Sequence, residues 1–355
     1  MRKLSVLMVS PSLESRGGIS AVAGRLTAQL HALGWRVGFI GSRVDGPRWQ
    51  SALHTAFSYF RFVSSALRRR PDLIHIHCSE NLSYYRKQTY VFLAMLMRRR
   101  VVLHVHPDRF VEFCARARFP LRLSLKRVFA YAEAVIVLSE TTRRRLLRLY
   151  PDARIFVLPN PVQVPDFRCG PEAEAPEVLY MGWFIPEKGV YDLLEAVPGV
   201  VREVPAARFV FCGTYFIDRL REACAAPELR GHVDIRGWVT GDEKIEALSR
   251  ASLLVLPSYT EGFPNVVLEA MASCLPVVTT PVGANPEILK DGINGFFHPP
   301  GDTAALQEKI IRLLKDSSLR REMGRRNRAL VEERFDAHVI GNELTRIYTR
   351  LAAGE

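Results

Sequence analysis

The sequence of 355 residues has few cysteines and no long apolar runs. Its six cysteines are scattered, with no CxxC pair and no metal-ligand spacing, so a disulfide framework or a zinc site has little support and a reducing cytosol fits best. The apolar run near the N-terminus, from Leu4 to Val9, is too short for a signal peptide and suits a buried strand. No stretch approaches the roughly 20 apolar residues of a membrane span. We therefore expect a protein that is not integral to a membrane.

Acidic residues are scarce in the first half of the chain. Residues 1–165 contain 27 Lys and Arg against 9 Asp and Glu, whereas the remainder contains 22 against 28. Such a basic half could bind nucleic acid, anionic lipid headgroups or a phosphorylated acceptor. No helix-turn-helix, zinc or RNP-like pattern favours nucleic acid, so we expect an anionic membrane surface. The segment 115–127 mixes Leu, Phe and Arg, which is compatible with an interfacial helix.

Short apolar runs alternate with helix-length amphipathic segments along the whole chain. The length, with 48% apolar and 24% charged residues, allows two hydrophobic cores. The alternation predicts parallel sheets covered by helices on both faces. The strands are expected at 3–10, 35–42, 72–78, 101–106, 134–139 and 154–160, and then at 177–183, 207–213, 232–238, 252–258 and 276–282.

A stretch rich in proline and acid, residues 159–177, separates the two series of strands and is interpreted as a linker. We predict an N-terminal domain at 1–165, a C-terminal domain at 170–335 and a final helix, 336–355, that packs back on the N-terminal domain. The expected fold class is α/β, with two Rossmann-like doubly wound domains facing a central cleft. Ligands of such sheets bind beyond the carboxyl ends of the strands.

The segment PSYTEGFPNVVLEAMA places two carboxylates beyond one of these strands. The strand is expected to end at Leu256, Glu261 lies in the following loop, and Glu269 lies about one turn into a helix that begins near Asn265. A helix N-terminus suits a diphosphate, Gly262 lets the backbone approach a ligand closely, and carboxylates accept hydrogen bonds from vicinal hydroxyls. Alternatively, Glu261 merely complements the helix dipole and Glu269 is a solvated helical residue.

The strings VLPS, EGFPNVVLEAMA, PVVTTPVGANPEIL, DGINGFF and PPGD, in this order and spacing, resemble the C-terminal domain of family-4 retaining glycosyltransferases. The resemblance covers nearly all of residues 176–335 and implies the GT-B fold. It implies that Glu261 binds the transferred hexose and Glu269 the ribose of the nucleotide, with no general base. The neighbouring residues implied to contact the donor are Gly262, Phe263, Pro264, Asn265 and Val266.

The segment YMGWFIPEKG matches the same family. Lys188, in the turn after the expected strand, would neutralise the departing diphosphate, or it is a solvated turn lysine. The family usually has an arginine directly after Gly182, where this chain has Trp183. Either another cation supplies this charge, or Trp183 marks an altered donor geometry.

Three further positions of the C-terminal half are interpreted from the resemblance. In HVDIRGWVTGDEK, Trp238 and Val239 are candidates for holding the nucleotide base, with simple core packing as the alternative. Cys274 stands where glycine is common, so we expect a small packing residue without chemistry.

In the N-terminal half, Gly17 and Gly18 lie between the first expected strand and an amphipathic helix. The resemblance implies that this GG loop borders the donor diphosphate and the acceptor, although an ordinary strand-to-helix turn is the alternative. The segment SENLSYYRKQTY resembles a subgroup of bacterial polysaccharide glycosyltransferases. There, Arg86 and Lys87 would replace the missing arginine or bind an acceptor phosphate, and otherwise they belong to a solvated face.

Two HxH pairs, His75 with His77 and His104 with His106, end expected strands, and alternate residues of a strand share one face. No nearby Asp or Glu completes a metal-ligand set, so we expect packing or cleft lining and no metal. The resemblance implies that His106 orients the donor hexose or the acceptor hydroxyl, and its alternative is a structural histidine.

Together these features imply a retaining, metal-independent hexosyltransferase of bacterial polysaccharide biosynthesis. The donor would be a nucleotide diphosphate sugar, with a UDP-sugar expected, and the acceptor a lipid-linked saccharide. The N-terminal domain would bind the acceptor and the C-terminal domain the donor, without a cofactor, at the cytoplasmic face of the membrane. The alternatives are a catalytically silent scaffold that binds sugar nucleotides and a nucleotide-sugar epimerase on the same fold. Nothing in the sequence decides the oligomeric state.

Overall fold

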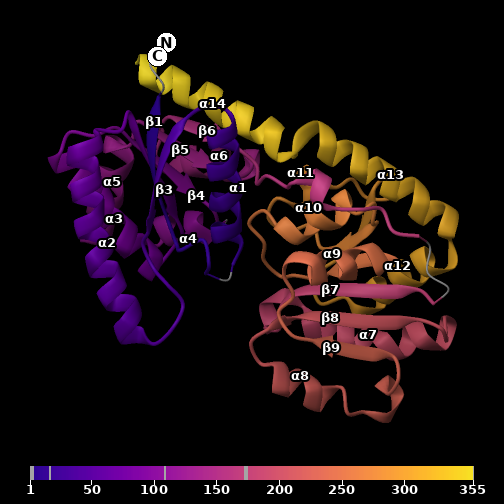
Figure 1. The fold of residues 1–355 in the computed structure, drawn as a ribbon. Coiled ribbons are helices and arrows are strands. Elements are labelled where there is room, and N and C mark those ends of the chain that lie inside the picture. The colour runs from indigo at the N-terminus through magenta and orange to yellow at the C-terminus, as the bar shows by residue number, and fades with distance from the viewer. Residues whose placement is uncertain (1–3, 16, 108, 172–174, 355) are drawn as a thin grey trace. The chain divides into compact units, whose positions relative to one another are not determined.

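The computed structural model describes residues 4–15, 17–107, 109–171 and 175–354, and the chain divides into two compact units. Unit 1 comprises Met1–Pro161 and Ala337–Glu355, and unit 2 comprises Val162–Asp336. Each unit contains a six-stranded parallel sheet with helices on both faces (Figure 1). The expected α/β class with two doubly wound domains is therefore confirmed.

The sheet of unit 1 has the strand order β2-β1-β3-β4-β5-β6. All six strands expected in the first half are present: β1 Ser5–Ser10, β2 Arg36–Gly41, β3 Leu73–Cys78, β4 Val101–Val105, β5 Ala134–Val137 and β6 Ile155–Val157. Alternate residues of β1 enter two different apolar clusters, Leu7 and Val9 on one face and Val6 and Met8 on the other. Both faces of the sheet are therefore buried, which is why its strands are almost continuously apolar.

The helices of unit 1 cover these two faces (Figure 1). One cluster takes Phe62 from α2, Tyr90 from α3 and Leu125 from α5, and the other takes Leu26 from α1 and Leu344 from α14. The last helix, α14, thus packs in unit 1 beside α1. The bounds are α1 Gly18–Ala32, α2 Arg48–Arg69, α3 Leu82–Leu96, α4 Arg109–Ala115, α5 Leu121–Tyr131, α6 Glu140–Leu149 and α14 Ala337–Ala353.

The sheet of unit 2 has the strand order β12-β11-β10-β7-β8-β9. The five strands expected in the second half are confirmed, as β7 Glu177–Trp183, β8 Arg208–Thr214, β9 Val233–Arg236, β10 Leu253–Leu256 and β11 Val277–Thr279. The sixth, β12 Gly295–Phe297, was not predicted, because its two apolar residues, Phe296 and Phe297, lie between a glycine and the polar and proline residues that follow. Its Gly295 lies so close to β11 that an added Cβ would be 2.5 Å from the carbonyl oxygen of Val277.

The helices of unit 2 include α10, which begins at Asn265 as predicted. The α-helices are α7 Val190–Glu203, α8 Ile217–Ala223, α9 Gly241–Arg250, α10 Asn265–Ala272, α11 Asn285–Ile288, α12 Thr303–Lys315 and α13 Ser317–Arg334. Three short 3-10 turns are η1 Val164–Asp166, η2 Pro186–Lys188 and η3 Pro227–Leu229. Of the predicted linker, Glu172 to Glu174 lie outside the described residues.

A disulfide joins Cys169 to Cys274, so the expectation that the chain lacks disulfides was wrong, and Cys274 is more than a packing residue. The two Cα atoms are 5.1 Å apart although 105 positions separate the residues in the sequence. Helix α13 holds both segments, because one nitrogen of Arg328 donates to the carbonyl oxygens of Phe167 and Ala272. Sequence spacing cannot reveal such a pairing, since only the packing of α13 brings the two cysteines together.

Within the described part of the chain, no helix combines the length and the apolar character needed to cross a bilayer.

We predict that Cys274→Ser lowers the free energy of unfolding by about 2 to 4 kcal/mol, because the crosslink closes a long loop in the unfolded chain. Urea denaturation without reductant measures this change. Cys224→Ser, at a half-buried free thiol, is the matched control and should change little. Alkylation of the unfolded, unreduced protein should label four cysteines, and labelling of all six would contradict the disulfide.

Candidate functional site

Three loops of unit 2, after β7, β10 and β11, approach one another so closely that glycine is required at the contacts. Strand β10 pairs with both β7 and β11 in the sheet, so the carboxyl ends of the three strands lie side by side. An added Cβ on Gly189 would be 2.0 Å from the oxygen of Pro257, and one on Gly283 would be 2.0 Å from the backbone oxygen of Glu261. Both glycines also have a positive φ, 64° and 57°, which other residues rarely adopt. Backbone packing therefore holds these loops in place.

Glu261 lies at this junction and is only 9% exposed. Its Oε1 accepts hydrogen bonds from Ser258 Oγ at 2.7 Å and from Lys188 Nζ at 2.7 Å. Lys188 Nζ also donates to the backbone oxygen of Thr260 at 3.4 Å. Charge-assisted bonds of this kind fix the direction of a carboxylate. The structure thus brings together Lys188 and Glu261, and the alternative of a solvated turn lysine is wrong.

Glu269, on α10, is 4% exposed, so the alternative of a solvated helical residue is wrong. Its Oε1 accepts a hydrogen bond at 2.9 Å from Nζ of Lys244, in the first turns of α9. Lys244 was missed at the sequence level. The signal available was a lysine six residues after Trp238 in GWVTGDEK, but only its bond to Glu269 in the folded chain distinguishes it from any surface lysine. Glu261 and Glu269 are therefore each matched by one lysine.

The start of α10 offers backbone groups more than side chains. Phe263 and Pro264 are buried, and the Phe263 ring packs edge-on against Phe335 with centroids 5.7 Å apart. Gly262, Asn265 and Val266 keep part of their surface exposed. The first turn of a helix has N–H groups without partners inside the helix, so this segment can offer donors to an anionic group.

Trp183 is the last residue of β7, and its ring is partly exposed beside Tyr215, with centroids 5.3 Å apart. Its backbone oxygen accepts a hydrogen bond from the buried Tyr180 hydroxyl at 2.7 Å. Burial, and secondarily the charge of Glu261, holds the pKa of Tyr180 well above its ordinary value. Gly182 passes so close to β8 that a Cβ on Gly213 would be 1.9 Å from the Gly182 oxygen.

Trp238 and Val239 lie in the loop between β9 and α9 and are half-buried. They are therefore not enclosed as fully as core residues. The same loop leads into α9, which carries Lys244 to Glu269, so these two residues belong to the surroundings of the second carboxylate.

In unit 1, Gly17 precedes α1 with a φ of 139°, and Gly18 is the first residue of that helix. The space around Gly17 is open, with no heavy atom within 4 Å of an added Cβ. The positive φ, and not crowding, is therefore the reason for a glycine here.

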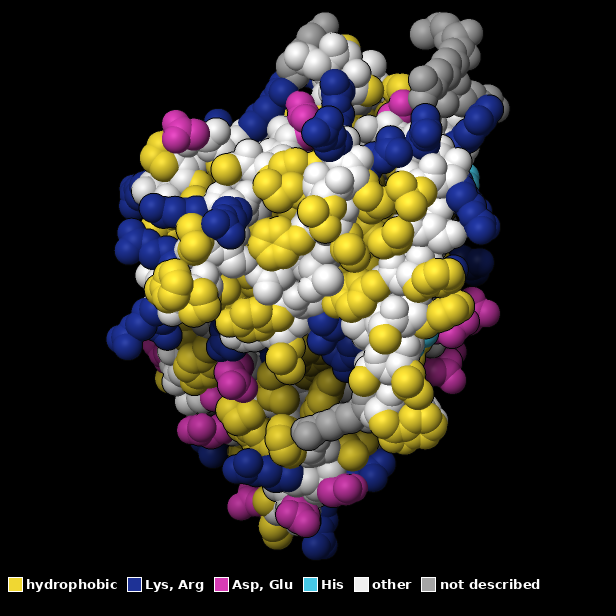
Figure 2. All heavy atoms as spheres, turned by 90° about the vertical axis from the view of Figure 1, so that its left-hand side faces the viewer, with side chains coloured by type: hydrophobic (Ala, Val, Ile, Leu, Met, Phe, Trp, Pro, Cys, Tyr) yellow, Lys and Arg dark blue, Asp and Glu magenta, His cyan; other side chains and the backbone are white. Residues whose placement is uncertain are grey.

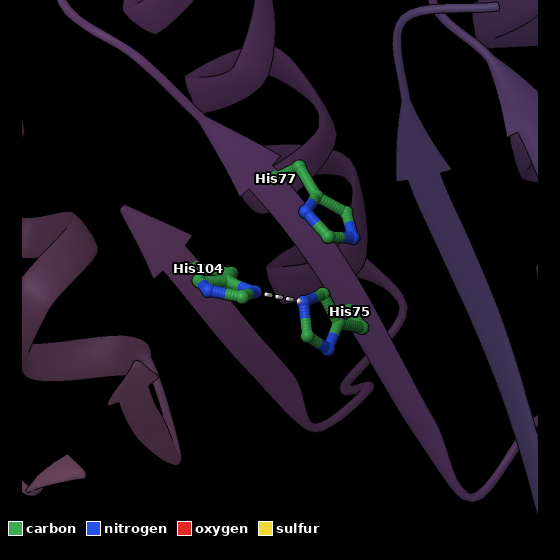
Figure 3. Close-up of side chains that lie close together, drawn as sticks. All are labelled: His75, His77 and His104. Carbon is green, nitrogen blue, oxygen red and sulfur yellow. Dashed lines mark hydrogen bonds between the residues drawn. The ribbon is translucent and has the colours of Figure 1, made fainter. Parts of the chain in front are cut away.

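The four histidines of the HxH pairs lie on one face of the sheet, as expected, and all are buried (Figure 3 shows three of them). His75 Nδ1 is hydrogen-bonded to the Tyr348 hydroxyl of α14, and His75 Nε2 lies 3.1 Å from His104 Nδ1. His77 Nδ1 lies 2.7 Å from His106 Nε2. Ring nitrogens of His75, His77 and His104 lie within 4.8 Å of one another and could hold a metal ion. The hydrogen bonds between the rings favour the packing role expected from the sequence.

Burial controls the charge of these histidines. It lowers the pKa of His75 and of His106 to about 3, with repulsion from His106 and from Lys87 as the respective second causes. The pKa values of His77 and His104 are likewise held well below the ordinary value, mainly by burial. His106 is therefore a neutral imidazole near pH 7. Such a ring can orient a hydroxyl by hydrogen bonding but is a poor proton acceptor.

Lys87 is buried, so a solvated face is the wrong description of this residue. Its Nζ donates to Ser42 Oγ and lies 5.7 Å from the centroid of the Tyr90 ring. Burial lowers the pKa of Lys87 to about 7. Arg86 is partly exposed, and burial followed by repulsion from Arg43 lowers its pKa. Among the described residues, Nε of Arg86 is buried without a hydrogen-bond partner.

Two family models match the chain, one in each half. The model described as Glycosyltransferase Family 4 matches residues 16–164, and the model described as Glycosyl transferases group 1 matches residues 166–330. With two parallel-sheet units, these matches define a glycosyltransferase of the GT-B class. The chain belongs to the family-4 glycosyltransferases.

Curated relatives agree with this family, and a solved structure agrees with the fold. The capsular polysaccharide biosynthesis glycosyltransferase CapM of Staphylococcus aureus is 28% identical over 48% of this chain and 44% of its own length. The phosphatidyl-myo-inositol mannosyltransferase of Mycobacterium leprae is 31% identical over 61% of this chain and 59% of its own. The chain spans about half the length of the curated relatives it matches. The Anabaena protein HepE, solved with UDP and glucose, has a TM-score of 0.78 at 18% identity, covering 98% and 99% of the two chains.

We predict that the buried histidines make folding stability depend on pH in the acid range. Their pKa values are lower in the folded state than the ordinary 6.5, so the unfolded chain binds more protons and stability falls as pH drops from about 6.5 toward about 3. His104→Leu removes one of these histidines and should reduce the slope of the free energy of unfolding against pH by up to about 1.4 kcal/mol per pH unit. Urea denaturation at several pH values between 7 and 4.5 measures this slope. His232→Leu, at a half-buried histidine of unit 2, is the control, and an equal change there would contradict the assignment.

Proposed function

We propose that the protein is a hexosyltransferase that uses a nucleotide diphosphate sugar, with a UDP-sugar as the expected donor. The observation that carries this proposal is the pair of buried glutamates, Glu261 and Glu269, each bonded to a lysine around the start of α10. The structural neighbour HepE, which was solved with UDP and glucose, supports a UDP-sugar. In this proposal Glu261 binds hydroxyls of the hexose, and Glu269 binds the ribose.

The chemistry we propose is transfer with retention at the anomeric carbon. The bond from that carbon to the diphosphate oxygen breaks, and the acceptor oxygen forms its bond on the same face. The acceptor proton passes to an oxygen of the departing diphosphate, so no protein base is needed. Lys188 and the first N–H groups of α10 would stabilise the growing charge on the diphosphate. For this, Lys188 Nζ would turn from Glu261 toward the diphosphate, a small movement for a flexible side chain.

The other candidate residues have narrower proposed roles. Trp238 and Val239 would hold the nucleotide base through backbone contacts. Gly17 and Gly18 would border the diphosphate and the acceptor. Neutral His106 would orient the donor hexose or the acceptor hydroxyl.

Three residues bear on the charge available to the donor diphosphate. Trp183 replaces the usual arginine, and a tryptophan supplies no cation there. Arg86 and Lys87 are the residues proposed to bind an acceptor phosphate or to supply the missing charge. Lys87, with a pKa of about 7, is only partly charged near neutral pH, so Arg86 is the better cation.

We further propose that the acceptor is a lipid-linked saccharide of cell-envelope polysaccharide synthesis, and that the protein works without a metal or other cofactor at the cytoplasmic face of the membrane. The names of two relatives support this acceptor class, because one acts in capsular polysaccharide biosynthesis and the other on a phosphatidylinositol lipid. The excess of Lys and Arg in residues 1–165 supports an anionic membrane surface. We propose no nucleic-acid partner for this basic half.

Two other functions make different predictions for the same protein. A silent scaffold, suggested by Trp183, would bind the donor and transfer nothing. An epimerase would convert the donor sugar without any acceptor.

We predict that UDP-glucose, or another member of a panel of nucleotide sugars, raises the melting temperature of the protein, because a ligand of the folded state stabilises it by about 2.7 kcal/mol at 100 times its Kd. Glu261→Gln should weaken this binding at least tenfold, since it removes the charged acceptor of the hexose hydroxyls. Glu246→Gln, at an exposed glutamate of α9, is the matched control. If no nucleotide sugar shifts the melting temperature, the donor-binding proposal is wrong.

We predict that labelled hexose is transferred to a bacterial lipid extract from the nucleotide sugar that raises the melting temperature most. NMR of the product should show that the α-configuration of the donor is retained. The transfer rate should be the same with and without EDTA. Glu261→Ala should reduce the rate at least 100-fold. Donor binding without transfer to any extract, together with normal polysaccharide in Glu261→Ala cells, would favour the scaffold. Conversion of the donor without acceptor would identify an epimerase.

A further inference from the structure

Helix α2 has two apolar faces, and only one of them is used by the fold. Phe62 and Ala66 point into the core of unit 1. The opposite side carries a second apolar stripe, whose members at 3.6 residues per turn fall within a sector about 80° wide. Its side chains are 53 to 69% exposed: Trp49, Leu53, Phe57, Phe60 and Leu67. A surface helix ordinarily places polar residues on this side.

The stripe continues onto the neighbouring helices of the same face. Helix α2 packs beside α3, and α3 packs beside α5. The exposed apolar residues of these neighbours are Leu82, Tyr85, Met95 and Leu96 on α3, with Phe119 just before α5 and Leu123 within it. Figure 2 shows hydrophobic side chains gathered over this part of the molecule. We call these residues, with the α2 stripe, the apolar face. Single exposed apolar residues are normal, whereas a contiguous group marks an interaction surface.

The three helices of the apolar face carry charge of one sign. Helices α2, α3 and α5 contain no Asp or Glu. By helical position, Arg61 and Arg68 lie directly beside the α2 stripe. The exposed basic residues of the three helices and their ends are Arg61, Arg68, Arg69, Arg70, Arg98, Arg118, Arg122, Lys126 and Arg127. Figure 2 shows Lys and Arg along the margins of the hydrophobic group, and also some Asp and Glu.

We propose that the apolar face is the surface by which this protein docks on an anionic lipid bilayer. The apolar side chains would enter the boundary between headgroups and acyl chains, where Trp and Tyr are favoured. The arginines around them would meet the negative headgroups, each contributing attraction near the surface. A second copy of the chain fits less well, because it would bring a second set of arginines against the first with no carboxylate on these helices to pair them.

This inference rests on the proposed function in one respect, because a lipid-linked acceptor would give the protein a reason to dock. The surface itself follows from exposure and charge alone. It assigns the contact to α2, α3 and α5, whereas the sequence suggested only the segment 115–127.

The test is flotation of the full chain with vesicles of phosphatidylcholine, with and without phosphatidylglycerol, at low and high salt. We expect binding to the vesicles that contain phosphatidylglycerol, weakened by salt because surface charges are screened. The variant Trp49→Ser/Phe57→Ser/Phe60→Ser should bind at least tenfold less, and Arg61→Glu/Arg68→Glu should do the same at low salt. Both should melt near the wild-type temperature, since the replaced side chains are exposed.

Matched controls come from unit 2, namely Ile293→Ser at an exposed apolar residue and Arg325→Glu at an exposed arginine. They should bind vesicles as the wild type does. Trp49 also provides a direct probe, because brominated lipids should quench wild-type fluorescence more than that of Trp49→Phe.

Three results would overturn the proposal: no binding to the anionic vesicles, equal losses in the control variants, or a dimer in sedimentation that the triple variant dissociates while vesicle binding persists. The last would identify a second copy as the partner. The UDP-glucose melting shift, measured on the same samples, keeps the two proposals separate. Vesicle binding without any melting shift from a nucleotide sugar would support the docking surface and contradict the proposed function. A melting shift without vesicle binding would support the proposed function and contradict the docking surface.

Discussion

The candidate site of unit 2 depends on the close contact between the loop after β7 and the loop after β10. At Gly189, in the loop after β7, the backbones approach so closely that an added Cβ would be 2.0 Å from the carbonyl oxygen of Pro257, in the loop after β10. This contact exists because β7 and β10 are paired in the parallel sheet. It places Lys188 and Glu261, 73 positions apart in the sequence, within 2.7 Å of each other. Without it, a lysine and a glutamate on two mobile loops would gain little from pairing.

The two units differ in how their buried ionisable side chains are stabilised. In unit 2 the buried carboxylates of Glu261 and Glu269 each have a lysine partner, which offsets the cost of removing a charge from water. In unit 1 the buried Lys87 is bonded to the neutral Ser42 hydroxyl, and burial depresses its pKa. The nearby histidines are kept neutral by the same effect. One unit therefore offers fixed ion pairs, and the other offers neutral hydrogen-bonding groups beside the weakly held charge of Lys87.

Part of the exposed surface of unit 1 is apolar, although the interior of the unit buries its apolar side chains. The strands and the inner faces of α2, α3 and α5 bury their apolar residues, whereas the outer face of α2 leaves a second stripe in contact with solvent. A contiguous group of exposed apolar residues of this kind marks an interaction surface, which is the basis for the proposed docking of unit 1 on a bilayer.

The sequence by itself determined the elements and the family, because these depend on local patterns. Apolar runs predicted eleven of the twelve strands in the described part of the chain, since a strand buried on both faces must be apolar throughout, and the segment PSYTEGFPNVVLEAMA predicted a helix that begins near Asn265. The exception was β12, whose only apolar residues are Phe296 and Phe297. Only the tertiary structure decided which distant groups meet. Cys169 reaches Cys274 because α13 binds both segments, and Lys244 reaches Glu269 because α9 packs near α10. Such contacts follow from the packing of whole elements, which no local pattern records.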